Sequence, residues 1–195
     1  MLYRVSKKIA CKVFGTDDEN LEEYIYGIEL FFSSFVSTIL MLIIGVCINF
    51  LVESIIFMIS FSALRIYTGG YHSKSFLMCN ISTLIVYIIN VLSYKYLFEQ
   101  IVELYISIPV FVITFMLILI FSPVKNENNL LDKSEYISCK IKAIIVISIE
   151  TISYFVLLYL LNFESIAIMI PALFFVDVLI VVGLINNKGG ANNDK

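Results

Sequence analysis

The chain has 195 residues, of which 60% are hydrophobic and 15% charged, and its mean hydropathy is +0.95. Soluble domains have about 45–50% apolar and about 25% charged residues, so this composition indicates a membrane protein. A net charge of −3 without a basic run gives no reason to expect a nucleic-acid partner. Four cysteines without a CxxC pair and one histidine disfavour structural zinc, and we expect neither metal nor cofactor.

Residues 1–14 are predicted to form a basic amphipathic helix. One helical face carries Leu2, Val5, Ile9 and Val13, and the other carries Arg4, Lys7, Lys8 and Lys12. This pattern suits a helix that lies on an anionic leaflet better than a signal peptide, although an ordinary surface helix is the alternative. The acidic residues at 17–23 are then expected to form a solvated linker.

Six apolar segments follow, each close to the roughly 20 residues that cross a bilayer as a helix. They lie at 28–48, 51–66, 77–97, 102–122, 141–161 and 165–186, and the first two are separated only by a turn around 47–50. The sequence therefore predicts an all-α polytopic membrane protein. We expect one domain over 1–195, with the amphipathic helix followed by a six-span bundle at 28–186.

The distribution of basic residues predicts the orientation of the spans. Twelve of the thirteen Lys and Arg residues fall at the termini or in alternate loops, and Lys95 lies on the other side. Because basic residues accumulate in cytoplasmic loops, both termini and the loop between the second and third spans are expected to face the cytoplasm. A free thiol there would stay reduced.

That loop contains the residues best suited to catalysis. It holds His72, which is the single histidine of the chain, and Cys79 follows seven positions later. An imidazole can generate the reactive thiolate by taking the proton of the thiol. On one continuous helix the two residues would lie about 10.5 Å apart, so the chain must turn between them. The alternative is that Cys79 is a packed thiol and His72 an interfacial histidine, with no catalytic function.

Further residues of the same segment are candidates for substrate binding or for stabilising an oxyanion. Arg65 keeps its charge in apolar surroundings, although it could equally extend to lipid phosphates. Gly69 and Gly70 permit a tight turn and could offer backbone N–H groups. Lys74 is a further candidate for contact with substrate.

A group that orients His72 is not evident from the neighbouring sequence. Asn80, Glu29 and Asp177 are possible, and the sequence does not rank them. Glu150 and Asp177 lie inside predicted spans, where a charged side chain indicates function by default. Either could line a cavity, or could form a hydrogen-bonded contact between helices.

Arg65, the Gly69-Gly70 pair and the His72-x6-Cys79 spacing, placed between two cytoplasmic span ends, resemble the accessory gene regulator B family. The basic amphipathic start, six spans and the basic loop after the fourth span resemble it too. The resemblance implies an integral-membrane cysteine endopeptidase of quorum sensing, in the cell membrane of a Gram-positive bacterium.

The resemblance also implies a substrate and a reaction. Cys79 and His72 would remove the C-terminal part of a short pro-peptide of the accessory gene regulator D type through a thioester acyl-enzyme. A thiol or hydroxyl of the substrate would then close a thiolactone or lactone ring, giving the autoinducing peptide. A homodimer is expected on the same ground. The alternative from another class is a small exporter or channel, in which Glu150 and Asp177 line the path.

Overall fold

The computed structural model describes residues 2–15, 20–69, 76–98, 104–124 and 132–190, and this part of the chain is helical with no named strand. The elements are α1 (Leu2–Phe14), α2 (Leu21–Cys47), α3 (Leu51–Thr68), α4 (Phe76–Ser93), α5 (Leu104–Phe121), α6 (Lys133–Phe155) and α7 (Met169–Gly190), with a π-helical turn at Tyr94–Phe98, another at Val156–Leu160 and a 3₁₀ segment at Glu164–Ile168. The predicted all-α class is confirmed.

The described residues of the six predicted spans are helical except at the last position of three spans, residues 48, 122 and 161. The prediction is wrong at the start of the first span, because α2 begins at Leu21 and so includes residues assigned to a solvated linker. Glu22 and Glu23 lie in its first turn, where carboxylates interact favourably with the positive end of the helix dipole. α6 also begins earlier than the predicted 141, because Glu135 accepts the backbone N–H of Asp132 at 3.1 Å and caps the helix start.

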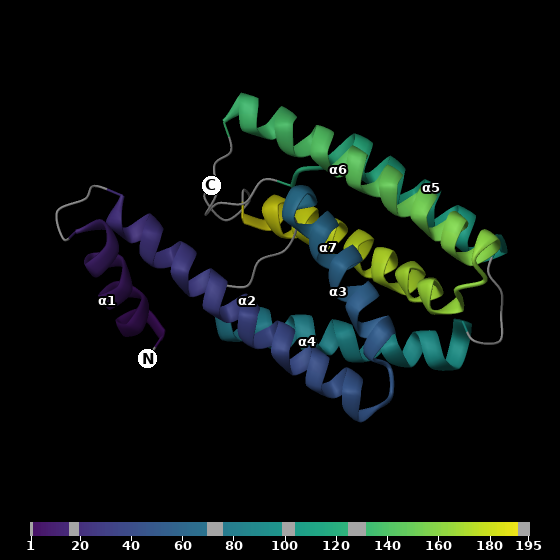
Figure 1. Ribbon diagram of the computed structural model, residues 1–195. Coiled ribbons are helices and arrows are strands. Elements are labelled where there is room, and N and C mark those ends of the chain that lie inside the picture. Colours follow the sequence, from purple (N-terminus) through teal and green to yellow (C-terminus); the bar gives the residue numbers. More distant parts are fainter. Residues whose placement is uncertain (1, 16–19, 70–75, 99–103, 125–131, 191–195) are drawn as a thin grey trace.

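Four helices form the centre of the molecule, with α3 and α5 each packed against both α6 and α7 (Figure 1). α2 packs against α3 and α4 beside this bundle, and α1 lies along α2. The aromatic core residues Phe57 and Tyr87 join α3 to α4, and Phe111 and Tyr154 join α5 to α6, with ring centroids 5.4 and 5.2 Å apart. The core is thus continuous across the helices that carry the candidate site.

The described helices have the length and surface of membrane spans. Four of them, Leu21–Cys47, Leu51–Thr68, Lys133–Leu160 and Glu164–Ile185, are long and apolar enough to cross a bilayer, and Tyr105–Phe121 is a shorter apolar helix. Large apolar side chains such as Ile59 and Ile152 are more than 60% exposed. A surface this apolar fits lipid rather than water. The chain is a polytopic membrane protein, and the count of six crossings stays a prediction.

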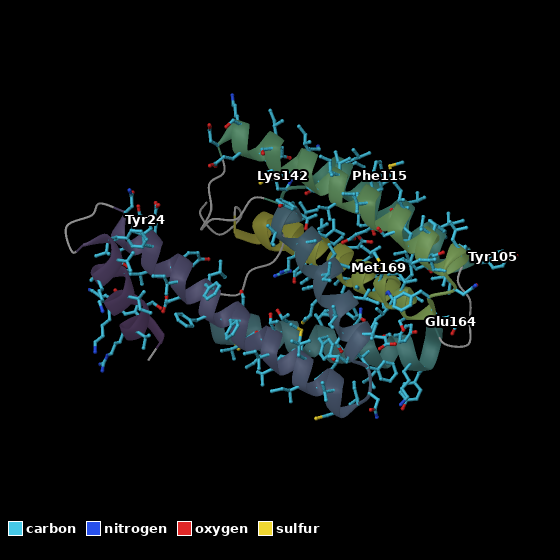
Figure 2. All side chains as sticks on the ribbon, in the orientation of Figure 1. Tyr24, Tyr105, Phe115, Lys142, Glu164 and Met169 are labelled. Carbon is cyan, nitrogen blue, oxygen red and sulfur yellow. The ribbon has the colours of Figure 1, made fainter. Side chains whose placement is uncertain are left out.

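α1 packs on α2 through small side chains rather than through its apolar stripe. Ser6 and Ala10 are fully buried, whereas Val5 and Val13 remain exposed. The ring of Phe14 stacks on Tyr24 of α2 at 4.1 Å, at the position labelled in Figure 2. Val5 and Val13 of the apolar stripe are therefore exposed, and the place of α1 at a membrane interface stays a prediction.

The turn between α2 and α3 is tight, as the sequence predicts. Phe50 donates its backbone N–H to the carbonyl of Gly45 at 2.8 Å, and Asn49 takes a positive φ of 58°. A Cβ at Gly45 would collide with the side chain of Ser54, which also bonds to the Tyr87 hydroxyl at 2.6 Å. Glycine at this position therefore lets α2 and α3 approach closely.

Candidate active site

Gly69, which ends α3, has a backbone conformation that only glycine adopts readily. Its φ is 67° and its ψ is −140°, in the mirror image of the β region. A Cβ built there would lie 2.8 Å from the carbonyl oxygen of Val124. The sequence-based assignment of Gly69 to a turn is therefore confirmed, whereas Gly70 lies outside the described residues.

The close approach at Gly69 comes from the segment that follows α5. Val124 donates its backbone N–H to the carbonyl of Thr68 at 2.9 Å, and both residues are buried. Tyr136 on α6 donates its hydroxyl to the carbonyl of Ser122 at 3.3 Å. The last turn of α3, the residues after α5 and the first turn of α6 are thus held together, which fixes where the chain leaves α3.

This contact also bears on topology. Gly69 at the end of α3 and Val124 after α5 lie side by side, so these two described ends are on the same side of the bundle (Figure 1). The sequence places these two loops on one side because both are basic. The contact between the two described ends agrees with that placement, and the position of the loops and their exposure to the cytoplasm stay predictions.

α4 begins at Phe76, so Cys79 lies in its first turn. The exposed N–H groups of a helix start carry partial positive charge, which favours a thiolate. α3 ends at Thr68, and the residues between Gly69 and Phe76 lie outside the described part of the chain. The predicted break between His72 and Cys79 stays a prediction. His72 and Lys74 lie outside the described residues, as does the side chain of Cys79.

The start of α4 is attached to α2 by a polar contact that the sequence analysis did not foresee. Ser33 of α2 is 5% exposed, and its hydroxyl donates to the side-chain carbonyl of Asn80 at 2.8 Å. Asn80 follows Cys79 directly, so this bond fixes the turn that carries the candidate nucleophile. A serine within an apolar span was the only sequence signal, and it did not identify a partner.

Arg65 lies one turn before the end of α3, and its guanidinium carbon is 5.8 Å from the centre of the Phe61 ring. Its backbone carbonyl accepts the N–H of Gly69 at 3.2 Å, so this N–H already has an acceptor. On α6, the Lys142 ammonium lies 5.8 Å from the Tyr67 ring, near the same end of α3 (Figure 2). Aromatic rings thus hold two cations where α3 ends.

Residues 3–182 match the family Accessory gene regulator B, which is most of the chain. The chain belongs to this family.

Two relatives from Clostridium perfringens are named as AgrB-like proteins. The first, from strain 13 / Type A, is 33% identical over 135 residues, and the second, from strain SM101 / Type A, is 32% identical over 135 residues. Each alignment covers 66% of this chain and 63% of the relative, so less than two thirds of each relative is spanned. No solved structure matches the chain.

The candidates for a group that orients His72 occupy different places in this AgrB-family fold. Asn80 is in the second turn of α4, whereas Asp177 lies inside the bundle, where its carboxylate accepts the Thr114 hydroxyl at 2.9 Å. Glu29 lies on α2, one helical turn before Ser33. Asp177 therefore forms a contact between α5 and α7, and Asn80 is the candidate attached to the turn that carries Cys79.

Glu150 is buried in α6, and neither of its carboxylate oxygens has a hydrogen-bond partner among the described residues. The other cysteines, Cys11, Cys47 and Cys139, are free thiols. Cys47 is exposed at the end of α2 that is remote from the start of α4, and Cys139 is half-buried on α6. These cysteines lie outside the turn that carries Cys79.

Proposed function

We propose that this AgrB-family protein is a membrane cysteine endopeptidase in which Cys79 is the nucleophile and His72 its base. The observation that carries the proposal is the place of Cys79 in the first turn of α4, seven residues after His72 and within the part of the chain that matches the family. The bonds at Gly69 and at Asn80 support it. They fix both ends of the segment between α3 and α4, which a catalytic pair on separate elements needs.

The reaction follows from the chemistry of a thiolate and an imidazole. The Cys79 thiolate attacks the scissile carbonyl, and the amide oxygen becomes an oxyanion. The C–N bond then breaks, and the imidazolium of His72 gives its proton to the leaving amine. The products of this step are a thioester on Cys79 and a free C-terminal fragment.

Ring closure is a second acyl transfer. A thiol or hydroxyl within the bound peptide attacks the thioester carbonyl, its proton passes to His72, and Cys79 leaves as thiolate. A thioester exchanges with a thiol at almost no cost in free energy, so the energy of the acyl bond is retained for cyclisation. The apolar surroundings limit the water that would otherwise hydrolyse the intermediate.

The substrate in this proposal is a short pro-peptide of the accessory gene regulator D type, bound at the cytoplasmic side of a Gram-positive cell membrane. Arg65, Gly69, Gly70 and Lys74 would bind it or stabilise the oxyanion. The whole chain acts as one domain, and the working form is a homodimer.

A transport function is the second candidate, because Glu150 and Asp177 are buried inside the bundle although neither is paired with a cation among the described residues. A channel or exporter would place such groups along its path. A peptidase acts in detergent micelles without a gradient, whereas transport requires two compartments. Cleavage by the purified protein in micelles would therefore favour the peptidase.

The nucleophile is tested with purified protein and the cognate pro-peptide. Cys79→Ala is expected to abolish cleavage without lowering expression or membrane insertion. Cys139→Ala is the matched control, because it removes another thiol on the same side of the bundle, and it should retain activity. Cleavage by the Cys79→Ala protein, or loss of cleavage in Cys139→Ala alone, would refute the assignment.

A further inference from the structure

We infer that the side-chain amide of Asn80 donates a hydrogen bond to the oxyanion formed when Cys79 attacks its substrate. The inference rests on the proposed peptidase function and adds a catalytic residue to it. An acyl-transfer site needs a hydrogen-bond donor aimed at the developing negative charge. Asn80 adjoins Cys79 in the chain and carries a neutral donor that is suited to this role.

The hydrogen bond to Ser33 determines which part of the amide is available. Ser33 donates to the carbonyl oxygen of Asn80 at 2.8 Å, so this oxygen faces α2. The amide nitrogen lies on the other branch of the planar group and has two N–H donors. Among the described residues, the hydrogen bond recorded for this amide is the one from Ser33, and it uses the oxygen rather than the nitrogen. Ser33 thus leaves the donor end of Asn80 free for a ligand.

Ser33 also reduces the entropic cost of orienting the Asn80 amide. It is buried in α2, and its hydroxyl joins that helix to α4 across 47 positions of sequence. A donor that is already oriented loses no conformational freedom when charge develops, which is the basis of preorganised electrostatic stabilisation. Asn80 is also half-buried, so a hydrogen bond from it is weakened less by water than one from an exposed side chain.

Other candidate donors in the described part of this region are less suitable. The backbone N–H of Gly69 already donates to the carbonyl of Arg65 at 3.2 Å. The Arg65 guanidinium lies against Phe61, within α3 itself. Asn80 follows Cys79 directly in α4, so one helix carries both the donor and the residue proposed as nucleophile.

The decisive experiment compares Asn80→Ala with Ser33→Ala. Both variants remove the hydrogen bond between α2 and α4, but only Asn80→Ala removes the amide donor. We expect kcat for pro-peptide cleavage to fall by about 10²–10³-fold in Asn80→Ala, which is the usual effect of removing one oxyanion donor. KM should change little, because the interaction exists only in the transition state. The fall in kcat should be much smaller in Ser33→Ala, because this variant keeps the amide donor.

Alkylation of Cys79 by iodoacetamide separates this role from a structural one. Alkylation forms no oxyanion, so its rate in Asn80→Ala should match that of the original protein. Ser34→Ala is the control for Ser33→Ala, since Ser34 is the next residue of α2 and is exposed. If Asn80→Ala does not fold, Asn80→Gln keeps an amide on a longer side chain and should lower kcat while leaving alkylation unchanged.

Equal losses of kcat in Asn80→Ala and Ser33→Ala would overturn the inference, because the hydrogen bond between helices would then explain both. A parallel loss of alkylation and cleavage in Asn80→Ala would overturn it as well. Failure of the peptidase function itself gives a different result, since the original protein would then not cleave the pro-peptide in micelles, or Cys79→Ala would cleave it as well. The two hypotheses therefore fail in different experiments.

Discussion

Gly69→Ala tests whether the end of α3 is fixed by its contact with Val124. Alanine brings two penalties at this position. Its backbone must adopt a φ of 67° with a ψ of −140°, and its Cβ would lie 2.8 Å from the Val124 carbonyl oxygen. Because that oxygen belongs to the backbone, the collision can be relieved only if the Val124 segment moves away from Thr68.

The size of the effect follows from these two penalties. A residue held in a sparsely populated backbone region costs about 1–3 kcal/mol. Movement of Val124 would break its 2.9 Å bond to the Thr68 carbonyl, and an unsatisfied buried backbone group costs about 1–3 kcal/mol. The free energy of unfolding should therefore fall by roughly 2–6 kcal/mol. For a chain of this length, that corresponds to a Tm lower by roughly 4–24 °C.

Three other glycines provide matched controls. Gly15 has a φ of 94° but nothing within 4 Å of a Cβ, so Gly15→Ala reports backbone strain without a collision. Gly45→Ala reports a collision, with Ser54, without positive φ. Gly27 has neither feature and lies within α2, so Gly27→Ala should stabilise the protein by about 0.5–1 kcal/mol.

The assay is thermal unfolding in detergent micelles, followed by circular dichroism, with pro-peptide cleavage measured on the same samples. Gly69→Ala should lower Tm more than Gly15→Ala and should also lower kcat, because the segment that leads to His72 starts at Gly69. If Gly69→Ala lowers Tm no more than Gly15→Ala does, the contact with Val124 does not constrain the end of α3.

Two further predictions concern the catalytic pair and the topology. His72→Ala should slow both cleavage and alkylation of Cys79 near pH 7; raising the pH towards the free-thiol pKa of about 8.5 should restore alkylation more than cleavage, because the leaving amine still lacks its acid. The same alkylation profile with and without His72 would show that it is not the base. Single cysteines placed at positions 126–135 should be shielded from impermeant reagents in intact cells, and labelling from outside would contradict a cytoplasmic site.

The helices of this protein could be predicted because their causes are local. A span of apolar residues has to satisfy its backbone hydrogen bonds internally in lipid, so composition and length are enough to place a helix. The errors occur at the ends, as at Leu21 and Lys133, where capping and charge extend a helix beyond its apolar part. Hydropathy does not register polar first turns such as those of α2 and α6.

Only the reactive residues of the candidate site could be predicted from the sequence. A single histidine and a nearby cysteine are recognisable from residue type and spacing, and the glycine pair indicated the turn. The supporting contacts could not be foreseen, since Val124 lies 55 positions from Gly69 and Ser33 lies 47 positions before Asn80. No local pattern marks a carbonyl or a hydroxyl as the partner of a residue so distant.

The sequence by itself determined that this is an all-α membrane protein, which segments are apolar, and where a thiol and an imidazole come close along the chain. Hydrophobicity, helical periodicity and residue chemistry act over a few turns, so they can be read in order. The tertiary structure alone decided that Gly69 meets Val124, that Ser33 orients Asn80, and that Asp177 bonds to Thr114 while Glu150 has no described partner. These results depend on how whole helices pack, and packing is set by all the contacting faces together rather than by any one segment.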